Sequence, residues 1–405
     1  MGERRSIARP RVLVIYPGLI PSVEISVLIP LRYLAKHGRI ELHAGTVEEL
    51  ALFHELSWCD IVVFSRSCLT DELPALCKVR QLHIPYIYDL DDNFFRLAEQ
   101  KEQTQLFLQE PGVMETLKYF ISGARVVKTG SEQMVMDMKP YNANIVIHPY
   151  VFDFTLLKKR KTSPEDGERI TIGYAGSLVH SEDLMMICDA LNRIAQEYPS
   201  VRFAFYGARP QNTEMLSGEL LERCEFIPFQ RNYAAFIEDL SARGWTIALA
   251  PLKDSVCNRS KTDNKYREYA ACGIVGVYSR MPLYDGRVRD GVNGMLAEDS
   301  ARSWYEKLSH LLDHPGQRRL MARRAYEDVS KNNRVHAVAD RWLKELILPN
   351  LNDGLMSQSQ RRSMMLSGSY RAKVYAEALS VLPLRIRLRF AVRCAAKRIK
   401  RMLHI

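Results

Sequence analysis

The feature of this sequence that most constrains its fold is a recurring short apolar segment, rich in β-branched residues, that alternates with longer stretches of helical periodicity. Before a polar, Lys-rich segment at Lys158–Arg169, the apolar segments are Arg11–Tyr16, Ile40–Ala44, Ile61–Ser65, Pro85–Leu90, Ala124–Thr129 and Asn144–His148. After it they are Ile170–Tyr174, Arg202–Tyr206, Glu225–Pro228, Thr246–Ala250, Ile274–Tyr278 and Met295–Ala297. Near-continuous apolar strands between helices are typical of parallel sheets that are covered on both faces.

The restart of this pattern after residue 169 predicts two doubly wound α/β domains facing a cleft, and it argues against one eight-stranded barrel. We expect a Rossmann-like domain at residues 1–155 and a second one at 156–330. A helical return segment at 331–352 and a basic tail at 353–405 would follow. Ligands of such folds bind at the carboxyl ends of the strands, so the residues that follow each strand are the candidates for a site.

The composition, with 47% hydrophobic and 26% charged residues, is that of an ordinary globular protein. No apolar run approaches the roughly 20 residues that a membrane-spanning helix needs, and the N-terminus has no apolar signal segment. The eight cysteines are scattered without the paired spacing of metal ligands, as free thiols are in a reducing compartment. These observations disfavour secreted, membrane-spanning and zinc-binding classes, and they favour a cytoplasmic protein.

The positive charge of the chain is concentrated in its C-terminal tail. Residues 354–405 contain twelve Lys or Arg and one acid, so the tail carries +11 and the rest of the chain −1. Within residues 384–403 basic residues fill the positions between apolar side chains that recur at helical spacing. These apolar residues are Leu384, Leu388, Ala391, Val392, Ala395, Ile399 and Leu403. This pattern predicts a cationic amphipathic helix that lies on an anionic membrane surface. The alternative is a helix docked on the body of the protein. Because that body is nearly neutral, the charge distribution argues against nucleic-acid binding.

Gly176 follows a predicted strand and precedes a helix start. A glycine in such a turn permits close approach of the backbone, and free N–H groups at Gly176 and Ser177 would bind an anionic phosphate. The alternative is a tight turn in which Ser181 or Asp183 caps the helix.

The segment after Thr246–Ala250 is the densest in polar side chains. Helical periodicity from Thr262 places Lys261, Lys265 and Glu268 on one side. Lysines at a helix start suit phosphates, and a carboxylate can accept hydrogen bonds from the vicinal hydroxyls of a ribose. The alternative is a solvated helix face with ion pairs along the helix. The small, apolar end of this helix, residues 270–273, favours a packed helix beside a cleft.

In the first predicted domain, Asp89, Asp91 and Asp92 gather at a strand end. Several like charges are costly to bury unless they meet cations or hydroxyls. A divalent-metal site, a site for sugar hydroxyls or an acceptor, and a capped helix start are three interpretations. Arg66, at another strand end, would serve a phosphate or pair with one of these carboxylates.

The residues resemble those of GT-B glycosyltransferases of the glycosyltransferase family 4 type. The resemblance covers roughly residues 10–345. Its most specific parts are Gly173–Ser177 through Asp183-Leu184, Asn258–Lys261 through Glu268–Ile274, and Asp290–Leu296. It implies that the second domain binds a nucleotide-sugar donor, with Glu268 on the nucleotide ribose, and that the first domain receives the acceptor. It also implies that no metal is bound.

The chain departs from the family pattern at two places. Ser260 stands where the earlier of two glutamates usually contacts the donor sugar, so sugar recognition must differ. The usual Arg-then-Lys phosphate pair is absent, and Ser177 and His180 stand in that loop. We expect Arg259, Lys261 or Lys265 to supply the missing positive charge, and Asp91 or Asp92 to act where many members have a histidine.

The resemblance implies a glycosyltransferase, retaining by likeness to its family, that moves a sugar from a nucleotide donor to a glycan or lipid-linked acceptor. Such an enzyme would work in cell-surface polysaccharide or glycoconjugate synthesis, in the cytoplasm at the inner membrane face. A GT-B sugar epimerase, and a degenerate GT-B scaffold that binds glycan or partner proteins without turnover, are the alternatives.

Overall fold

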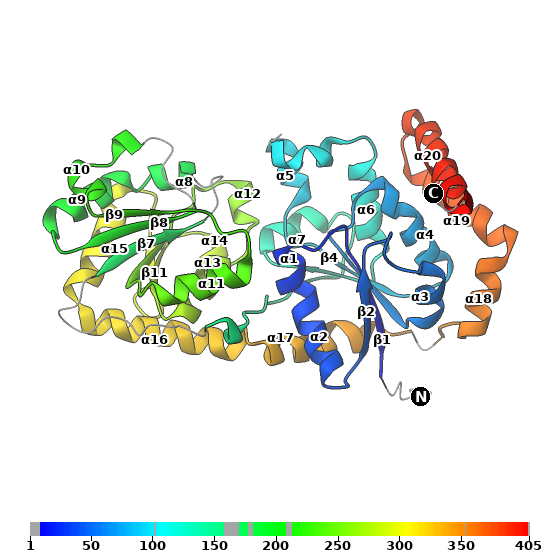
Figure 1. Ribbon diagram of the computed structural model, residues 1–405, viewed down its shortest axis with the longest axis horizontal. Coiled ribbons are helices and arrows are strands. Elements are labelled where there is room, and N and C mark those ends of the chain that lie inside the picture. The colour runs from blue at the N-terminus through cyan, green and yellow to red at the C-terminus, as the bar shows by residue number, and fades with distance from the viewer. Residues whose placement is uncertain are drawn as a thin grey trace. The chain divides into compact units, whose positions relative to one another are not determined.

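The computed structural model describes residues 9–100, 103–157, 170–176, 181–207, 213–352 and 354–403. The chain forms two compact units (Figure 1). Unit 1 comprises Met1–Tyr150 and Val338–Ile405, and unit 2 comprises Val151–Ala337. The polar, Lys-rich segment Lys158–Arg169, which separates the two predicted domains, lies outside the described residues.

Unit 1 is built on a parallel six-stranded sheet with the order β2-β1-β3-β4-β5-β6. The strands are β1 (Arg11–Ile15), β2 (Glu41–Gly45), β3 (Ile61–Ser65), β4 (Tyr86–Asp89), β5 (Val126–Thr129) and β6 (Ile145–Ile147). The strands β3, β4 and β5 are buried along their whole length, because helices cover both faces of the sheet.

The helices of the first part of unit 1 connect these strands. They are α1 (Pro21–Val23), η1 (Glu24–Leu28), α2 (Ile29–Lys36), α3 (Leu52–Trp58), η2 (Thr70–Glu72), α4 (Leu73–Gln81), α5 (Phe94–Gln100), η3 (Gln103–Gln109), α6 (Val113–Gly123) and α7 (Glu132–Met138). After unit 2 the chain returns through α17 (Val335–Arg341), η7 (Trp342–Ile347) and η8 (Leu348–Asn350).

The basic tail forms three helices, α18 (Gln358–Leu366), α19 (Gly368–Val381) and α20 (Leu384–Leu403), along one side of unit 1 (Figure 1). Their side chains Met365, Tyr370, Val374 and Phe390 belong to the same apolar core as α4 and β4. The tail is therefore part of the body of unit 1.

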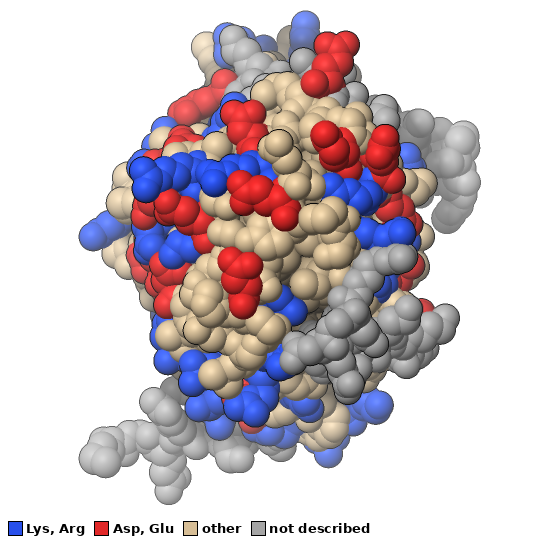
Figure 2. Space-filling model, turned by 90° about the vertical axis from the view of Figure 1, so that its left-hand side faces the viewer, with Lys and Arg blue, Asp and Glu red and all other residues tan. Residues whose placement is uncertain are grey.

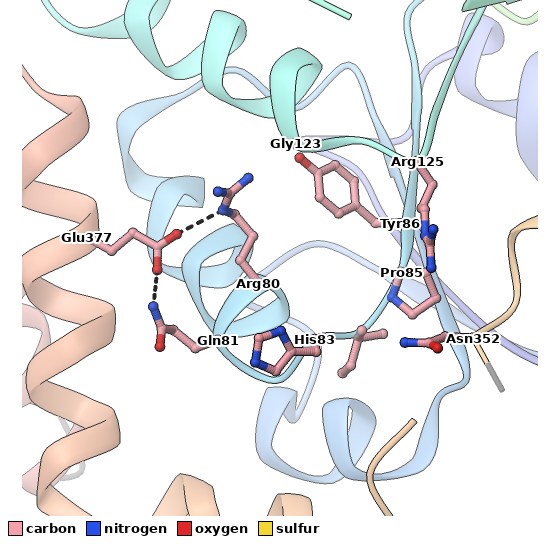
Figure 3. A pocket seen from close by; sticks show the side chains of 10 residues that line it. Arg80, Gln81, His83, Pro85, Tyr86, Gly123, Arg125, Asn352 and Glu377 are labelled. Carbon is pink, nitrogen blue, oxygen red and sulfur yellow. Dashed lines mark hydrogen bonds and ion pairs between the residues drawn. The ribbon is translucent and has the colours of Figure 1, made fainter. Parts of the chain in front are cut away.

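One ion pair and two hydrogen bonds fix the position of α19. Glu377 of α19 accepts hydrogen bonds from Nε of Arg80 (2.9 Å) and from the amide of Gln81, both on α4 (Figure 3). It also accepts one from the Tyr119 hydroxyl of α6. A carboxylate with three donors on two helices holds α19 in one place and orientation.

Unit 2 has a second parallel six-stranded sheet, with the order β12-β11-β10-β7-β8-β9. Its strands are β7 (Thr171–Ala175), β8 (Arg202–Tyr206), β9 (Cys224–Ile227), β10 (Ile247–Ala250), β11 (Val275–Ser279) and β12 (Met295–Ala297). Numbered within the unit, this is the 3-2-1-4-5-6 order of dinucleotide-binding folds.

The helices of unit 2 are η4 (Phe154–Leu156), α8 (Ser181–Met185), α9 (Cys188–Glu197), η6 (Thr213–Met215), α10 (Gly218–Leu221), α11 (Tyr233–Ala242), α12 (Val256–Arg259), α13 (Asn264–Cys272), α14 (Pro282–Asp285), α15 (Ala301–Asp313) and α16 (Pro315–Asn332). Alternate strand residues enter two separate cores. Leu191 of α9 packs with Leu249, whereas Tyr269 of α13 packs with Ala248 and Ala250. The helices that follow β7 and β10 thus cover opposite faces of the sheet.

Each predicted strand is confirmed within one or two residues, and so is the predicted fold of two parallel α/β sheets with a C-terminal helical tail. Acidic and basic side chains are interspersed over the face of unit 2 that Figure 2 presents. Among the described residues no helix is long and apolar enough to cross a membrane.

Candidate functional site

The sheet of unit 2 has its topological switch point between β7 and β10. These two strands are neighbours, and the chain leaves them toward opposite faces of the sheet. A crevice forms at the carboxyl ends of two such strands, and ligands of open α/β sheets bind there. The described residues that reach this edge come from the ends of β7 and β10, from α8 and from the segment 251–268.

Tyr269 of α13 joins β7 to β10 at this edge. Its hydroxyl accepts a hydrogen bond from N–H of Ala175 (3.1 Å) and donates one to O of Leu249 (3.0 Å). Burial raises the pKa of Tyr269 well above its ordinary value, so the hydroxyl keeps its proton and can donate. The hydroxyl thereby sets the distance of α13 from both strand ends, and with it the position of the preceding residue, Glu268.

Lys265 of α13 lies above Tyr174 of β7, with its ammonium 5.1 Å from the ring centroid. The pKa of Lys265 is lowered to about 8, chiefly by burial; Lys261 also lowers it, whereas Glu268 and Asp183 raise it. The four charged groups therefore act on one another at the strand ends. An ammonium with this pKa is held in an environment that lacks a full counter-charge, and an anion would supply one.

Glu268 is partly buried one helical turn from Lys265. Burial raises the pKa of its carboxyl, and Arg267, Lys265 and Tyr233 act in the opposite direction. The guanidinium of Arg267 is itself occupied by the Asp263 carboxylate (2.9 Å) and by O of Val151 (2.9 Å). The Glu268 carboxylate is therefore suited to accept hydrogen bonds from ligand hydroxyls.

Asp183 was expected at most as a helix cap, and the structure gives it a larger part. The carboxylate is buried and accepts hydrogen bonds from N–H of Lys253 (2.9 Å) and the amide of Asn258 (3.4 Å). It thus ties α8 to the segment after β10. The sequence carried no signal for this contact, because it joins residues that are 70 positions apart.

Tyr174 is a second site residue that sequence reasoning missed. Its side chain is fully buried, and its hydroxyl has no hydrogen-bond partner among the described residues. A Cβ on Gly176 would lie 2.4 Å from this hydroxyl oxygen, so only glycine fits beside it. Gly176 was predicted for its backbone N–H, but that group donates to O of Tyr206 (3.0 Å) and is not available to a phosphate. Ser177 and His180, predicted in the same loop, lie outside the described residues.

Two further predicted residues lie near the site with other partners. Arg259 pairs with the Asp254 carboxylate at 2.6 Å, and both side chains are exposed. Ser260 is buried, and its hydroxyl donates to O of Val256 (2.9 Å). Each of these contacts is local, so the positive charge beside the end of β7 is that of Lys265, on which Lys261 acts electrostatically.

In unit 1, the predicted pair Asp91 and Asp92 surrounds Arg66. The Arg66 guanidinium contacts both carboxylates, that of Asp92 at 2.8 Å, and it lies 4.9 Å from the centroid of the Phe94 ring. Arg66 has a φ of 58°, a left-handed conformation that a residue with a side chain rarely adopts. Such backbone strain concentrates at functional sites. The Asp92 side chain is the most exposed of the three, at 44%.

Asp89 has a different role from its neighbours. Its carboxylate is fully buried and accepts hydrogen bonds from the Ser26 and Ser65 hydroxyls and the Lys128 ammonium, each at 2.7 Å. The third carboxylate of the predicted cluster is therefore bound by buried groups of unit 1 and has a structural role. No group of three His, Cys, Asp or Glu side chains in the described part of the chain is arranged to hold a metal ion.

Residues 169–314 match the family model "Glycosyl transferases group 1". No curated protein matches the chain significantly. Among solved structures, Alr3699/HepE of Anabaena in complex with UDP has a TM-score of 0.58 at 15% identity, over 83% of this chain and 99% of that one. Sucrose-phosphate synthase of Thermosynechococcus elongatus has a TM-score of 0.56 at 12% identity, over 83% and 98%. A putative UDP-N-acetylglucosamine 2-epimerase of Listeria monocytogenes has a TM-score of 0.51 at 12% identity, over 83% and 95%. At such identities the likeness establishes a common fold, the GT-B fold.

Proposed function

We propose that the chain is a glycosyltransferase and that unit 2 binds its nucleotide-sugar donor at the switch point; the GT-B fold and the match of residues 169–314 to the glycosyl transferases group 1 model support this. The observation that carries this proposal is the placement of Lys265 and Glu268 on α13, beside the ends of β7 and β10. Two of the similar structures, both of HepE, are described as complexes with UDP and with UDP-glucose. A uridine diphosphate is therefore the first ligand to test.

In this proposal each group at the edge has one task. Glu268 accepts hydrogen bonds from the ribose hydroxyls. The ammonium groups of Lys265 and Lys261 offset the charge that grows on the leaving diphosphate, and the Tyr174 hydroxyl donates to it. The lysines supply the positive charge, so the proposal includes no metal cofactor.

The acceptor side of the reaction is assigned to unit 1. The Asp92 carboxylate, exposed and oriented by Arg66, would accept a hydrogen bond from the acceptor hydroxyl, with Asp91 holding Arg66 in place. The transfer would retain the anomeric configuration. The acceptor would be a glycan or a lipid-linked sugar of cell-surface polysaccharide or glycoconjugate synthesis.

The tail helix supports a location at the inner membrane face. Its outward side has a ridge of Leu384, Leu388 and Val392, which are 80%, 76% and 61% exposed. Exposed arginines at 385, 389 and 393 flank this ridge. Apolar side chains between basic ones suit an anionic membrane interface. The inward side docks on unit 1 through Phe390, so the docking alternative holds for one face of α20, while Leu384, Leu388 and Val392 of the predicted stripe are exposed.

A donor screen tests the activity. The full chain is incubated with nucleotide sugars, with and without lipid-linked acceptors, and release of nucleoside diphosphate is measured. Acceptor-dependent release with UDP-glucose or a related donor is the expected result. Formation of an isomerised sugar without any acceptor would favour the epimerase. Donor binding without release under every condition would favour the non-catalytic scaffold.

Sedimentation with liposomes tests the membrane surface. The full chain should pellet with vesicles that contain anionic lipid, and salt should weaken the binding. The triple variant Leu384→Glu, Leu388→Glu, Val392→Glu keeps the docked face of α20 and should stay in the supernatant. Equal pelleting of both proteins would contradict the assignment. Truncation of the whole tail is a poorer test, because it removes core side chains such as Tyr370.

A further inference from the structure

A second feature of α20 is the apolar cavity beneath its docked face. The cavity has a volume of about 430 Å³ and lies among the segment after β2, α4, α19 and α20. Apolar side chains form most of its wall: Val47, Leu52, Ala75, Val374, Ala378 and Phe390. Four charged residues also line it, the acids Glu48 and Asp71 and the bases Lys78 and Arg371. Cavities of this size, mostly apolar with a few polar groups, are the usual form of small-molecule sites.

The walls of this cavity are held by tight contacts. Glu377 fixes α19 to α4 through Arg80 and Gln81 (Figure 3). The start of α20 lies against Gly112, where a Cβ would come within 2.5 Å of the Ile386 side chain. The two helices that roof the cavity are therefore fixed on unit 1, and the space between them is a property of the folded unit.

The chemistry of the walls selects the occupant. Water in such a space finds few hydrogen-bond partners, because most lining atoms are carbon. A hydrocarbon chain gains free energy for every methylene that it buries there. The two acids and two bases of the lining balance in charge, so the apolar wall is what selects the occupant.

The position of α20 shows where such a chain would come from. One side of the helix carries Phe390 and Cys394 into the cavity, and the opposite side carries the exposed ridge of Leu384, Leu388 and Val392. The cavity is thus bounded by the same helix whose other side the proposed function places at a membrane. A hydrocarbon chain that leaves the lipid layer would pass beside α20 to reach the cavity.

Two walls of the cavity belong to segments that begin at the same sheet edge as the proposed acceptor site. Val47 is two residues beyond the end of β2, and Ala75 is on α4, which follows β3 and Arg66. These segments begin at the carboxyl edge of the sheet of unit 1, because all of its strands are parallel. We propose that the cavity binds the hydrocarbon chain of a lipid-linked acceptor, whose polar head lies toward Arg66 and Asp92. This assignment rests on the proposed function of a sugar transferase with a lipid-linked acceptor.

Cys394 provides a direct readout on the full chain, because it lines the cavity and is partly exposed. Dodecyl phosphate below its micelle concentration should slow the labelling of Cys394 by a maleimide at least tenfold, and butyl phosphate should not. Affinity should rise about threefold to fourfold per added methylene until the cavity is full. Labelling of Cys224, a partly exposed thiol on β9 of unit 2, serves as the control and should not change.

Variants that fill the cavity distinguish binding inside the cavity from binding at the outward surface of α20. Ala378→Phe should weaken protection by dodecyl phosphate at least tenfold. Val374→Phe is the second variant should the first fail to fold, as a melting curve would show. Leu388→Glu, on the outward side, is the matched control and should leave the protection unchanged. Unchanged protection in a folded filled variant, or an affinity independent of chain length, would overturn the proposal.

Two further outcomes identify the source of the bound hydrocarbon and distinguish this proposal from the proposed function. Short-chain phosphatidylglycerol that protects Cys394 as well as dodecyl phosphate does would assign the cavity to bulk lipid and overturn the assignment to the acceptor. Labelling is measured without donor. Protection by dodecyl phosphate in a protein that never releases nucleoside diphosphate would therefore support the cavity while refuting only the transferase.

Discussion

The pKa of Lys265 makes binding of the donor nucleotide depend on pH in a range where few other groups titrate. The free protein holds this ammonium at a pKa of about 8, lowered chiefly by burial. A bound diphosphate places negative charge beside it and raises the pKa, so binding is coupled to proton uptake. Between pH 7 and pH 9 the charged fraction of free Lys265 falls from about nine-tenths to about one-tenth. The affinity for UDP should therefore fall about tenfold, or about 1.4 kcal/mol.

Two neighbouring charges predict how variants shift this midpoint. Lys261 lowers the pKa of Lys265, so Lys261→Gln should move the midpoint to higher pH while it weakens binding. Glu268 raises the pKa, so Glu268→Gln should move the midpoint to lower pH. Lys265→Gln should bind UDP more weakly and lose this pH dependence.

Calorimetric titration measures both effects. At pH 8, experiments in two buffers with different ionisation enthalpies should reveal an uptake of about half a proton per UDP, because about half of the free Lys265 groups are then neutral. The same titrations from pH 7 to pH 9 give the slope of the affinity. An affinity that stays constant over this range, or an equal slope in Lys265→Gln, would refute the placement of Lys265 at the diphosphate.

Three other predictions concern the same edge and the core of unit 1. Glu268→Ala should weaken UDP binding by about 1–3 kcal/mol, since ribose hydroxyls lose their acceptor, and an unchanged calorimetric affinity would remove this residue from the site. Tyr269→Phe should lower the free energy of unfolding by about 1–3 kcal/mol, because N–H of Ala175 loses a buried partner. Denaturant titration checks it, and wild-type stability would show that the hydroxyl is dispensable. Burial, with Lys128 nearby, lowers the pKa of His148 to about 2. Below about pH 6.5, His148 therefore binds a proton in the unfolded chain but stays neutral in the folded protein. The free energy of unfolding should fall by about 1.4 kcal/mol per pH unit below about 6.5, and His148→Gln should lack this part of the slope.

The strands could be predicted from sequence because each is a buried apolar run between helices, a property of a few adjacent residues. Lys265 and Glu268 could be found for a similar reason, since helical spacing places them on one side of α13. Tyr174, Asp183 and Tyr269 could not be found, because their parts depend on contacts between segments far apart in the chain. The Tyr269 hydroxyl and Ala175, for instance, are 94 positions apart.

The tail shows a second limit of sequence reasoning. Its apolar residues fall on two sides of one helix, and helical spacing alone does not say which side is covered. The choice depends on the surface that receives the helix, where Gly112 leaves room for Ile386. Of the predicted stripe, Leu384, Leu388 and Val392 lie on the side that stays exposed.

The division of unit 1 into two stretches of chain reverses the usual order of folding on the ribosome. The core of unit 1 includes Tyr370, Val374 and Phe390, so its first 150 residues must wait for segments made after the whole of unit 2. Unit 2 is complete in itself, and its two ends meet where N–H of Phe152 donates to O of Asn333 (2.7 Å). An insert whose ends meet folds as its own chain emerges, so the middle of the polypeptide would become native before its beginning. During synthesis the exposed apolar surface of the waiting half, beneath the future positions of α18–α20, is a natural target for chaperones.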